Sequence, residues 1–395
     1  MTQNYTLYYK LYRYLFFALM LLAGGAIFNK ANAQTLPRPD HIIILIEENQ
    51  PNSLVIGDPS VAPYINQLAS DTDAVVFTQF YALEHPSQPN YLDLFAGNNQ
   101  GVLDDNLPAN YPFTSPNMAY ELLHNGFSFI TYSQDLPSEG SDAQNSTTGS
   151  YARKHNPVTN WIGTSSNQVP DTCNQMYTQF PTDYSQLPTV CYVVPNEDSD
   201  MHNGTYPSTC TAGDYWMHEH LDSLLRWVRN NNALFIYTFD EDDGFFNNNI
   251  PTLFYGPMVK GGTCSTTYNL YSLLRTIEDM YNVGEHAGAA ATASDINNVW
   301  KSYPEGINSV SVNNSELKIS PNPVAAVLSF DGTRLSDASG QIIITDLAGR
   351  TISQFTLSES KKLDVNTSAY TAGLYFYHFI QNTGMAQTGK FVIAH

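Results

Sequence analysis

Basic residues are scarce in this sequence of 395 residues, which has 17 lysines and arginines against 37 aspartates and glutamates and a formal net charge of −20. Positions 1–34 hold three basic residues and no acidic one, positions 316–395 hold six of each, and the segment between them holds 8 basic and 31 acidic residues. Such an acidic surface repels nucleic acid and anionic membranes at long range. We therefore expect no nucleic-acid binding, and an anionic substrate would need local neutralisation by a metal ion.

Long apolar runs are also missing, with one exception near the start. Residues 14–28 are almost wholly apolar, follow Lys10 and Arg13, and precede Ala31-Asn32-Ala33. This arrangement is typical of a cleaved secretory signal peptide, which we place at residues 1–33. The alternative is a retained membrane anchor, for which the run is short. Because no later stretch approaches the roughly 18 to 20 apolar residues that cross a bilayer, we expect no stable transmembrane segment in the mature protein.

Cysteine is limited to four residues, all between positions 170 and 265. An even number in an exported protein predicts two disulfides, with three possible pairings. Their spacing matches no zinc-site pattern, so we do not expect cysteine to bind a metal. The four are Cys173, Cys191, Cys210 and Cys264.

The length suggests two domains, and the first has the alternating pattern of an α/β fold. A helical stripe that includes Trp216 and Leu225 follows Asp214, which is a candidate N-cap. Alternation of apolar strands with helices predicts a mainly parallel sheet covered by helices on both faces. The predicted strands are 41–46, 74–80, 127–131, 189–194 and 234–239, and a further helix is predicted at 62–68.

From about Ser309 the pattern changes to short strands of period two, separated by turns rich in Gly, Asn and Asp. This pattern predicts a small all-β module, and residues 284–316 have the composition of a join. We therefore predict a catalytic domain at 36–300, a linker at 301–316 and a C-terminal β-domain at 317–395.

Three segments place oxygen ligands or a nucleophile just after predicted strands. They contain Glu48-Asn49, Ser87 and Asp240-Glu241. In an open α/β sheet, the carboxyl ends of the strands meet at one edge, so these segments are expected to converge. Carboxylate and amide oxygens suit Mg, Mn or Ca, and a serine beside the ion could act as an activated nucleophile. Together they predict one metal-assisted phosphoryl-transfer site.

Each segment also has a structural interpretation when taken alone. Glu48-Asn49 fits a polar turn, Ser87 fits an ordinary N-cap, and the run of four acids from Asp240 fits a solvated or calcium-binding loop without EF-hand spacing. Ser87 lies just before a helical pattern that begins near Asn90, and a helix N-terminus suits a residue that becomes phosphoserine. His85 and Asn90 flank the serine and are predicted to hold phosphate oxygens.

Two further segments contribute His155, Asp200 and His202. An imidazole near the leaving oxygen could act as a general acid, because its ordinary pKa of about 6.5 suits mildly acidic to neutral conditions. A structural role for each histidine is the alternative.

In this order, the segments resemble the phosphoesterase family that contains bacterial and fungal acid phosphatases and bacterial and plant phospholipases C. The resemblance covers roughly residues 38–285. The motifs that carry it are IEEN, HPSQPNY with Gly97 downstream, SPNMAYELLHNGFSFITY, YARKHNP, VPNEDSDMHNG, FDEDDG, and IPTLFYGPMVKGG followed by YNLYSLLRTIED.

The resemblance implies the alkaline phosphatase superfamily, with a doubly wound sheet and one divalent metal ion, Mg, Mn, Ca or Zn, at the strand ends. It implies three sets of site residues: metal ligands Glu48, Asn49, Ser87, Asp240 and Glu241; catalytic residues Ser87, His155 and His202; and substrate-binding residues His85, Asn90 and Asp200.

One departure bears on function: IEEN is followed by Gln50-Pro51-Asn52-Ser53, where the phospholipase C branch usually has Arg-Ser-Phe-Asp. The acid phosphatase branch therefore fits better. The predicted activity is hydrolysis of phosphate monoesters through a phosphoserine. A phospholipase C or phosphodiesterase of the same fold and a non-catalytic calcium-binding surface protein are the alternatives.

The tail from about Leu317 to His395 resembles the type A sorting domain of the type IX secretion system, through SPNP, TDLAGR, AGLYFY and a final GKFVIA. The resemblance implies that the type IX machinery exports the chain across the outer membrane, to the medium or the cell surface. An accessory carbohydrate-binding β-sandwich is the alternative.

Overall fold

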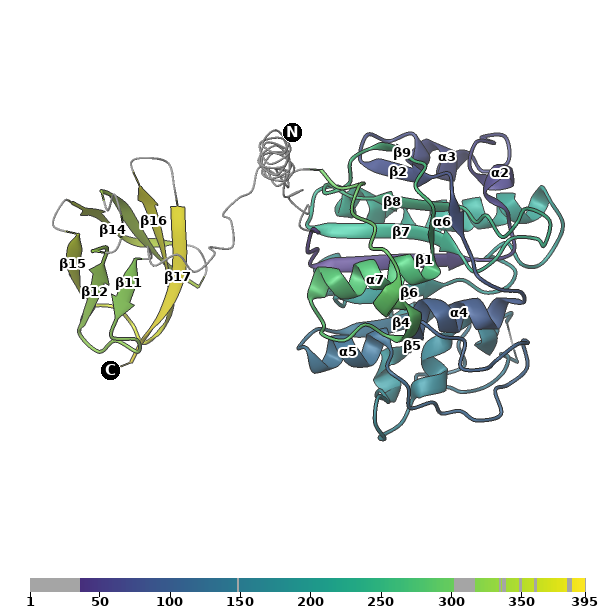
Figure 1. Cartoon of the computed structure of the whole chain (residues 1–395), viewed down its shortest axis with the longest axis horizontal. Helices are drawn as coiled ribbons and strands as arrows, with labels where there is room; N and C mark the ends of the chain where they lie inside the picture. Colours follow the sequence, from purple (N-terminus) through teal and green to yellow (C-terminus); the bar gives the residue numbers. More distant parts are fainter. Residues whose placement is uncertain are drawn as a thin grey trace, which may run out of the picture. The chain divides into compact units, whose positions relative to one another are not determined.

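The chain divides into two units, one ending at Lys301 and the other after it (Figure 1). The predicted signal peptide and residues 302–316 of the predicted linker lie outside the residues that the computed structural model describes. The described residues are 36–147, 149–301, 317–333, 335, 339–347, 350–358, 361–381 and 386–394.

An eight-stranded mixed sheet with the order β5-β4-β6-β1-β7-β8-β2-β9 forms the centre of the first unit. Neighbouring strands are parallel except at β8, which is antiparallel to both β7 and β2. The strands are β1 (His41–Glu47), β2 (Ala74–Phe77), β4 (Phe129–Ser133), β5 (Asn174–Met176), β6 (Val190–Val194), β7 (Ala233–Phe239), β8 (Thr252–Tyr255) and β9 (Gly262–Cys264).

The three central strands, β6, β1 and β7, are buried along almost their whole length. Their continuous apolar sequences are typical of parallel strands that are covered on both faces. Ile44 of β1 lies opposite Tyr192 of β6 and Ile236 of β7, so the three strands run in register. Their carboxyl ends therefore emerge together at one edge of the sheet.

Helices cover both faces of this sheet, which confirms the predicted α/β fold (Figure 1). On one face Phe95 packs against Phe129 and Tyr192. On the other face Trp216 contacts Tyr177. Among the described residues, no helix has the length and apolar character needed to cross a membrane. The first face carries α4 (Ser87–Ala96), α5 (Met118–His124) and α7 (Leu270–Tyr281), and the second carries α3 (Pro63–Ala69) and α6 (Ser208–Val228).

Shorter elements complete the unit. The short strands β3 and β10 pair in parallel outside the main sheet. The bounds are α2 (Asn52–Val55), β3 (Phe80–Tyr81), η1 (Arg153–His155), η2 (Pro157–Trp161), η3 (Asp171–Cys173), η4 (Tyr177–Gln179), η5 (Tyr184–Gln186), β10 (Tyr268–Asn269) and η6 (Gly288–Thr292).

Three sequence predictions need correction. The strand predicted at 74–80 is two strands, β2 and β3, which belong to different sheets. Helix α4 begins at Ser87 and not near Asn90, since Pro89 is tolerated in a first turn. Asp214 is not the N-cap of α6 but lies inside it, where its carboxylate accepts hydrogen bonds from the backbone N–H groups at the start of α3.

The predicted disulfides are wrong, because all four cysteines are free and buried. Cys191 lies on β6, and Cys264 lies on β9, five strands away in the sheet. At the usual strand spacing this is a separation of about 24 Å, whereas a disulfide needs Cα atoms within about 7 Å. Cys210 lies on α6, where its thiol faces Gln50.

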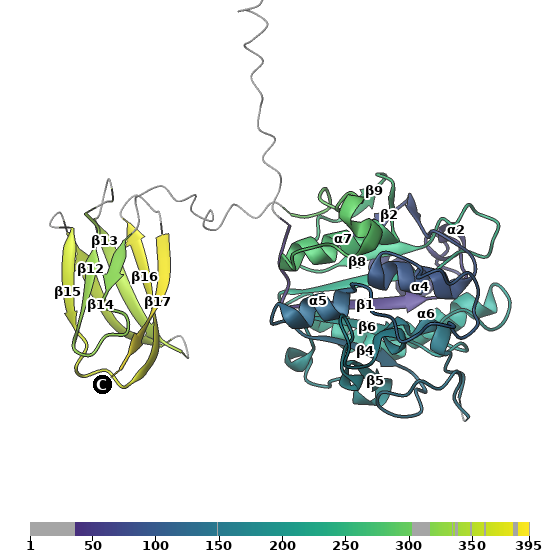
Figure 2. The same ribbon diagram turned by 60° about the horizontal axis from the view of Figure 1, so that its bottom comes forward.

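The second unit is built from two antiparallel sheets, as predicted for a small all-β domain (Figure 2). Alternate residues of β16, including Tyr375, Tyr377 and Phe379, face a shared apolar core with Phe330 and Ile344. The strands are β11 (Lys318–Ser320), β12 (Val327–Asp331) and β15 (Lys362–Asn366) in one sheet, and β14 (Thr351–Leu357), β13 (Gly340–Asp346), β16 (Gly373–Gln381) and β17 (Ala386–Ile393) in the other.

Candidate active site

The candidate site lies at the carboxyl edge of the central strands. Glu48 directly follows β1, Asp240 directly follows β7, and Asp200 lies six residues after the end of β6. Backbone hydrogen bonds join these segments: Glu48 N donates to Asp200 O at 2.7 Å, and Asp240 N donates to Glu47 O at 3.1 Å. The structure therefore brings the three strand ends together.

Ser87 is the first residue of α4 and is almost fully buried. Its hydroxyl lies 2.8 Å from Glu241 Oε1 and 3.1 Å from Glu48 Oε2, and it also interacts with Asp240. The serine oxygen thus faces three carboxylates at the positive end of a helix, an arrangement that suits a nucleophile beside a cation.

These carboxylates crowd one another, and within the described part of the chain no lysine or arginine forms an ion pair with them; Lys154 acts on Glu48 only from a distance. Burial, together with Glu48 and Glu241, raises the pKa of Asp240 well above its ordinary value. The Asp240 Oδ2 atom is buried and has no hydrogen-bond partner among the residues that the structure describes. A divalent cation that prefers oxygen ligands would relieve this repulsion, so the donor set fits a metal. Asn49, the fifth predicted ligand, donates from its amide to Glu48 and from its backbone to Asp240.

His155 is held rigidly between two carboxylates. Its Nε2 lies 2.9 Å from Glu48 Oε1 and its Nδ1 lies 3.3 Å from Asp200 Oδ2. Although burial opposes protonation, Glu48 and Asp200 raise the pKa of His155 to about 10. His155 in turn outweighs burial and lowers the pKa of Glu48 to about 2. Without a metal, Glu48 and His155 therefore form a charged pair.

His202 is only half buried and is less constrained. Its backbone N–H donates to Asp200 Oδ1 at 2.9 Å, so the Asp200 carboxylate lies between both histidines. Ligand atoms of Glu48, His155 and His202 all lie within 4.8 Å of one another, which makes a second possible metal-binding set. The two sets share Glu48.

The two predicted substrate-binding residues that flank Ser87 both contact other parts of the protein. His85 Nδ1 pairs with the Glu241 carboxylate, and its Nε2 lies 3.5 Å from Asp242. Asn90 uses both ends of its amide on the loop before α4: the oxygen accepts from Leu83 N and Glu84 N, and the NH₂ donates to backbone carbonyls. Asn90 therefore holds the loop that carries His85 and has no free donor for a phosphate.

Two residues of the site were missed by sequence reasoning. The Tyr91 hydroxyl donates to Glu48 Oε1 at 2.7 Å, and its ring stacks on His155 at 5.3 Å between centroids. Lys154 Nζ lies 3.3 Å from His202 Nε2 and donates to Asp105 Oδ2 at 3.1 Å. Burial lowers the pKa of Lys154, but Glu48 and Asp105 outweigh it and keep the pKa above its ordinary value. Tyr91 could have been found from its place one helical turn after Ser87.

Comparison with known proteins gives two family matches. A model of the phosphoesterase family matches residues 46–284, and a model of the secretion system C-terminal sorting domain matches residues 318–394. The second match indicates that the chain is exported, to a secreted or cell-surface location.

Individual relatives are phosphatases. The chain is 40% identical over 270 residues to a phosphatidylinositol-3-phosphatase of Mycobacterium tuberculosis, a match that covers 68% of this chain and 85% of that protein. It is 27% identical to a probable acid phosphatase of Kluyveromyces lactis, over 65% of this chain and 63% of the relative. A solved Vibrio parahaemolyticus protein of the alkaline phosphatase superfamily is 13% identical, covering 85% of this chain and 83% of that one, with a TM-score of 0.47.

Proposed function

Because this chain belongs to the phosphoesterase family and is a hydrolase of phosphoric esters, we propose that it is a secreted, metal-dependent acid phosphatase that cleaves monoesters through a phosphoserine. The observation that carries the proposal is the Ser87 hydroxyl, buried at the start of α4 and directed at Glu48 and Glu241. In the proposed export route, residues 1–33 direct the chain across the inner membrane, and the type IX machinery recognises the sorting domain.

One divalent ion would be held by Glu48, Asp240 and Glu241 with the Ser87 hydroxyl and the Asn49 amide. An ion in that place would neutralise phosphate charge and lower the pKa of the serine hydroxyl. The alternative set, with His155 and His202, shares only Glu48. The unpartnered Asp240 oxygen favours the acidic set.

The protein's own groups account for the remaining chemistry. The Ser87 oxygen attacks phosphorus as its proton passes to a neighbouring carboxylate, and the positive end of the α4 dipole offsets the charge on the phosphate oxygens. The bond between phosphorus and the alcohol oxygen breaks, and a histidine protonates the departing oxygen. Water then attacks the phosphoserine, which releases inorganic phosphate and restores the serine hydroxyl.

Of the two histidines, His202 is the better placed proton donor. His155 is fixed by Glu48, Asp200 and the Tyr91 ring, whereas His202 is half buried beside Lys154. A fixed imidazolium suits the positioning of Glu48. A less constrained imidazole can reach a substrate oxygen.

The test is hydrolysis of p-nitrophenyl phosphate beside bis(p-nitrophenyl) phosphate by the full chain, after chelation and re-addition of single metals. We expect metal-restored cleavage of the monoester, weak cleavage of the diester, and a loss of at least about 10³-fold in Ser87→Ala, as expected for a removed nucleophile.

The matched control is Ser272→Ala, since Ser272 is also a buried serine in the first turn of a helix, α7, but lies outside the site. This variant should keep full activity. Activity that survives in Ser87→Ala would refute the phosphoserine mechanism, and a preference for the diester would favour the phosphodiesterase alternative. No hydrolysis with any metal would favour a calcium-binding surface protein.

A further inference from the structure

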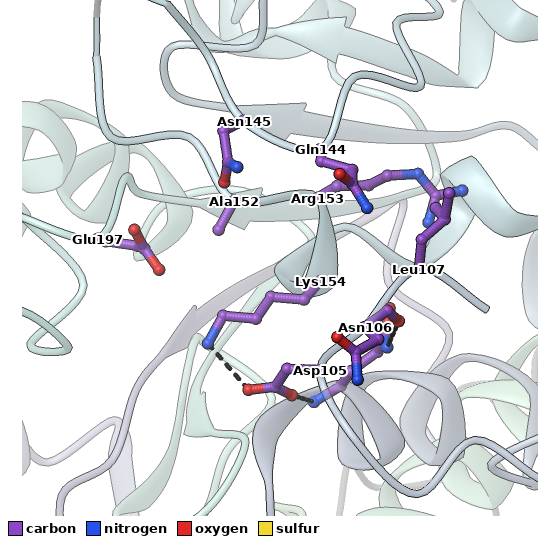
Figure 3. A pocket seen from close by; sticks show the side chains of 10 residues that line it. Asp105, Asn106, Leu107, Gln144, Asn145, Ala152, Arg153, Lys154 and Glu197 are labelled. Carbon is purple, nitrogen blue, oxygen red and sulfur yellow. Dashed lines mark hydrogen bonds and ion pairs between the residues drawn. The ribbon is translucent and has the colours of Figure 1, made fainter.

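A cavity of about 180 Å³ opens beside the candidate site (Figure 3). Two of the residues that line it are sequence neighbours of residues in the candidate site. Gln88 directly follows Ser87, and its amide holds the loop at Asp104–Asn106. Lys154 directly precedes His155, and its amine lies 3.3 Å from His202. Gln88 and Lys154 therefore place the cavity next to the candidate site.

The position of Lys154 places the cavity on the side where the alcohol leaves. In an in-line displacement, the leaving oxygen lies opposite the attacking serine and next to the proton donor. The proposed donor, His202, borders the cavity through Lys154. The alcohol part of a bound monoester would therefore extend into this cavity.

The charged groups of the cavity balance one another. Arg153 and Lys154 supply two positive charges, and Asp105 and Glu197 supply two negative ones. Such a lining selects neither an anionic nor a cationic leaving group. Only Leu107 and Ala152 are apolar in the lining, so a purely aliphatic group would gain little there.

Several polar groups of the lining have unused hydrogen-bonding capacity. The side chains of Gln144, Asn145 and Glu197 make no hydrogen bond to any residue that the structure describes. Figure 3 shows Gln144 and Asn145 on one side of the cavity, with the Gln144 amide beside Arg153. The pairing of Asn145 with Ala152 fixes the backbone that carries these two exposed side chains, and their amides are open to a ligand. Amides and a carboxylate together offer donors and acceptors, which is the complement of a row of hydroxyl groups.

On the basis of the proposed function, we infer that this cavity is a leaving-group subsite for a small polyhydroxylated alcohol, such as a sugar or a cyclitol. Its volume lies below the roughly 300 Å³ at which ligand pockets usually begin, so one ring fits and acyl chains do not. The same ring chemistry occurs in free polyol phosphates and in phosphorylated lipid headgroups.

The test compares kcat/KM of the full chain for myo-inositol 1-phosphate, cyclohexyl phosphate and p-nitrophenyl phosphate. The first two share a six-membered ring, but only the first carries hydroxyl groups. We expect Asn145→Leu and Gln144→Leu each to reduce kcat/KM for the inositol ester by about 3- to 10-fold, the usual value of one hydrogen bond, and to leave the other two substrates unchanged. Asn230→Leu, an exposed asparagine after the end of α6, is the matched control.

A fourth substrate, a phosphatidylinositol monophosphate in phosphatidylcholine vesicles, separates the two sources of the ring. A selective loss with the soluble ester assigns the subsite to free polyol phosphates, and a selective loss only with vesicles assigns it to a lipid headgroup. Equal losses on every substrate, or none, would overturn the subsite. Failure of wild type to hydrolyse p-nitrophenyl phosphate would instead refute the proposed phosphatase.

Discussion

The two units differ in whether they bury charged side chains. The first unit buries carboxylates at the strand ends and beneath the helices, including Glu47, Asp240 and Glu278. Each of these three has one oxygen that accepts no hydrogen bond from any described residue. In the described part of the second unit, the buried polar residues are Thr345, Thr367 and Gln381, and none of them is charged.

This difference separates the unit that carries the candidate active site from a unit that has no buried charged residue in its described part. Burying carboxylates close together costs stability, because each ion loses solvation and repels its neighbour. Residues that are retained although they lower stability in this way are expected at functional sites. The second unit keeps its charges at the surface, as in the Asp346–Arg350 pair, where they affect stability little.

The largest effect is expected when one charge is removed from the acidic cluster formed by Glu48, Asp240 and Glu241. Asp240→Asn should reduce phosphatase activity by at least about 10²-fold and stabilise the metal-free protein by about 1–2 kcal/mol, since it relieves repulsion from Glu48 and Glu241. Steady-state kinetics and calorimetry of the chelated protein measure both effects.

The matched change in the second unit is Asp331→Asn. Asp331 is half-buried, accepts hydrogen bonds from Thr333 and pairs with Lys362 at 3.2 Å. We expect a slight fall in the melting temperature of the second unit and unchanged activity. A destabilised Asp240→Asn variant would contradict the view that the cluster is strained.

A metal ion should stabilise the first unit and leave the stability of the second unit unchanged. At a concentration about 100 times its Kd, a bound ion adds about 2.7 kcal/mol to the folded state. We expect the calorimetric transition of the first unit to rise and that of the second to stay constant. Glu48→Gln should abolish the rise, because Glu48 belongs to both possible ligand sets. A rise in both transitions would indicate non-specific binding.

The sequence located the first unit's central strands and acidic strand ends because buried parallel strands have continuous apolar runs. It did not locate β5, β8 and β9, whose three or four residues are too few to show a period. For the second unit, alternation predicted the small all-β domain.

Side-chain partners that depend on tertiary contacts could not be predicted from the sequence. Nothing in the neighbourhood of Asn90 shows that its amide is used by the preceding loop, and nothing near Lys154 shows that it approaches His202. Asp214 fitted a local N-cap, but its hydrogen bonds go to α3, 150 residues earlier in the chain.

An effect on stability alone, without loss of activity, is expected from a buried carboxyl outside the site. Burial raises the pKa of Glu278 to about 9, from an ordinary 4.5. Between these values the folded protein binds a proton that the unfolded chain has lost, so stability falls as pH rises, by up to about 1.4 kcal/mol per pH unit. Glu278→Gln should flatten this slope between pH 5 and 8.

Chemical denaturation at several pH values measures the slope. The control is Glu139→Gln, an exposed glutamate that should leave the slope unchanged. If Glu278→Gln keeps the slope of wild type, Glu278 is not protonated in the folded protein.

The smallest expected effect concerns the cysteines, all four of which belong to the first unit. If they are free, a reductant should not change either melting temperature, and four thiols should react with Ellman's reagent in denaturant without prior reduction. Burial raises the pKa of Cys173 and Cys210 to about 12, so reaction in the native state should be slow. Fewer than four thiols, with a lower melting temperature after reduction, would restore the disulfide prediction. Because a unit of this size buries a large apolar core, it needs no covalent crosslinks to stay folded outside the cell.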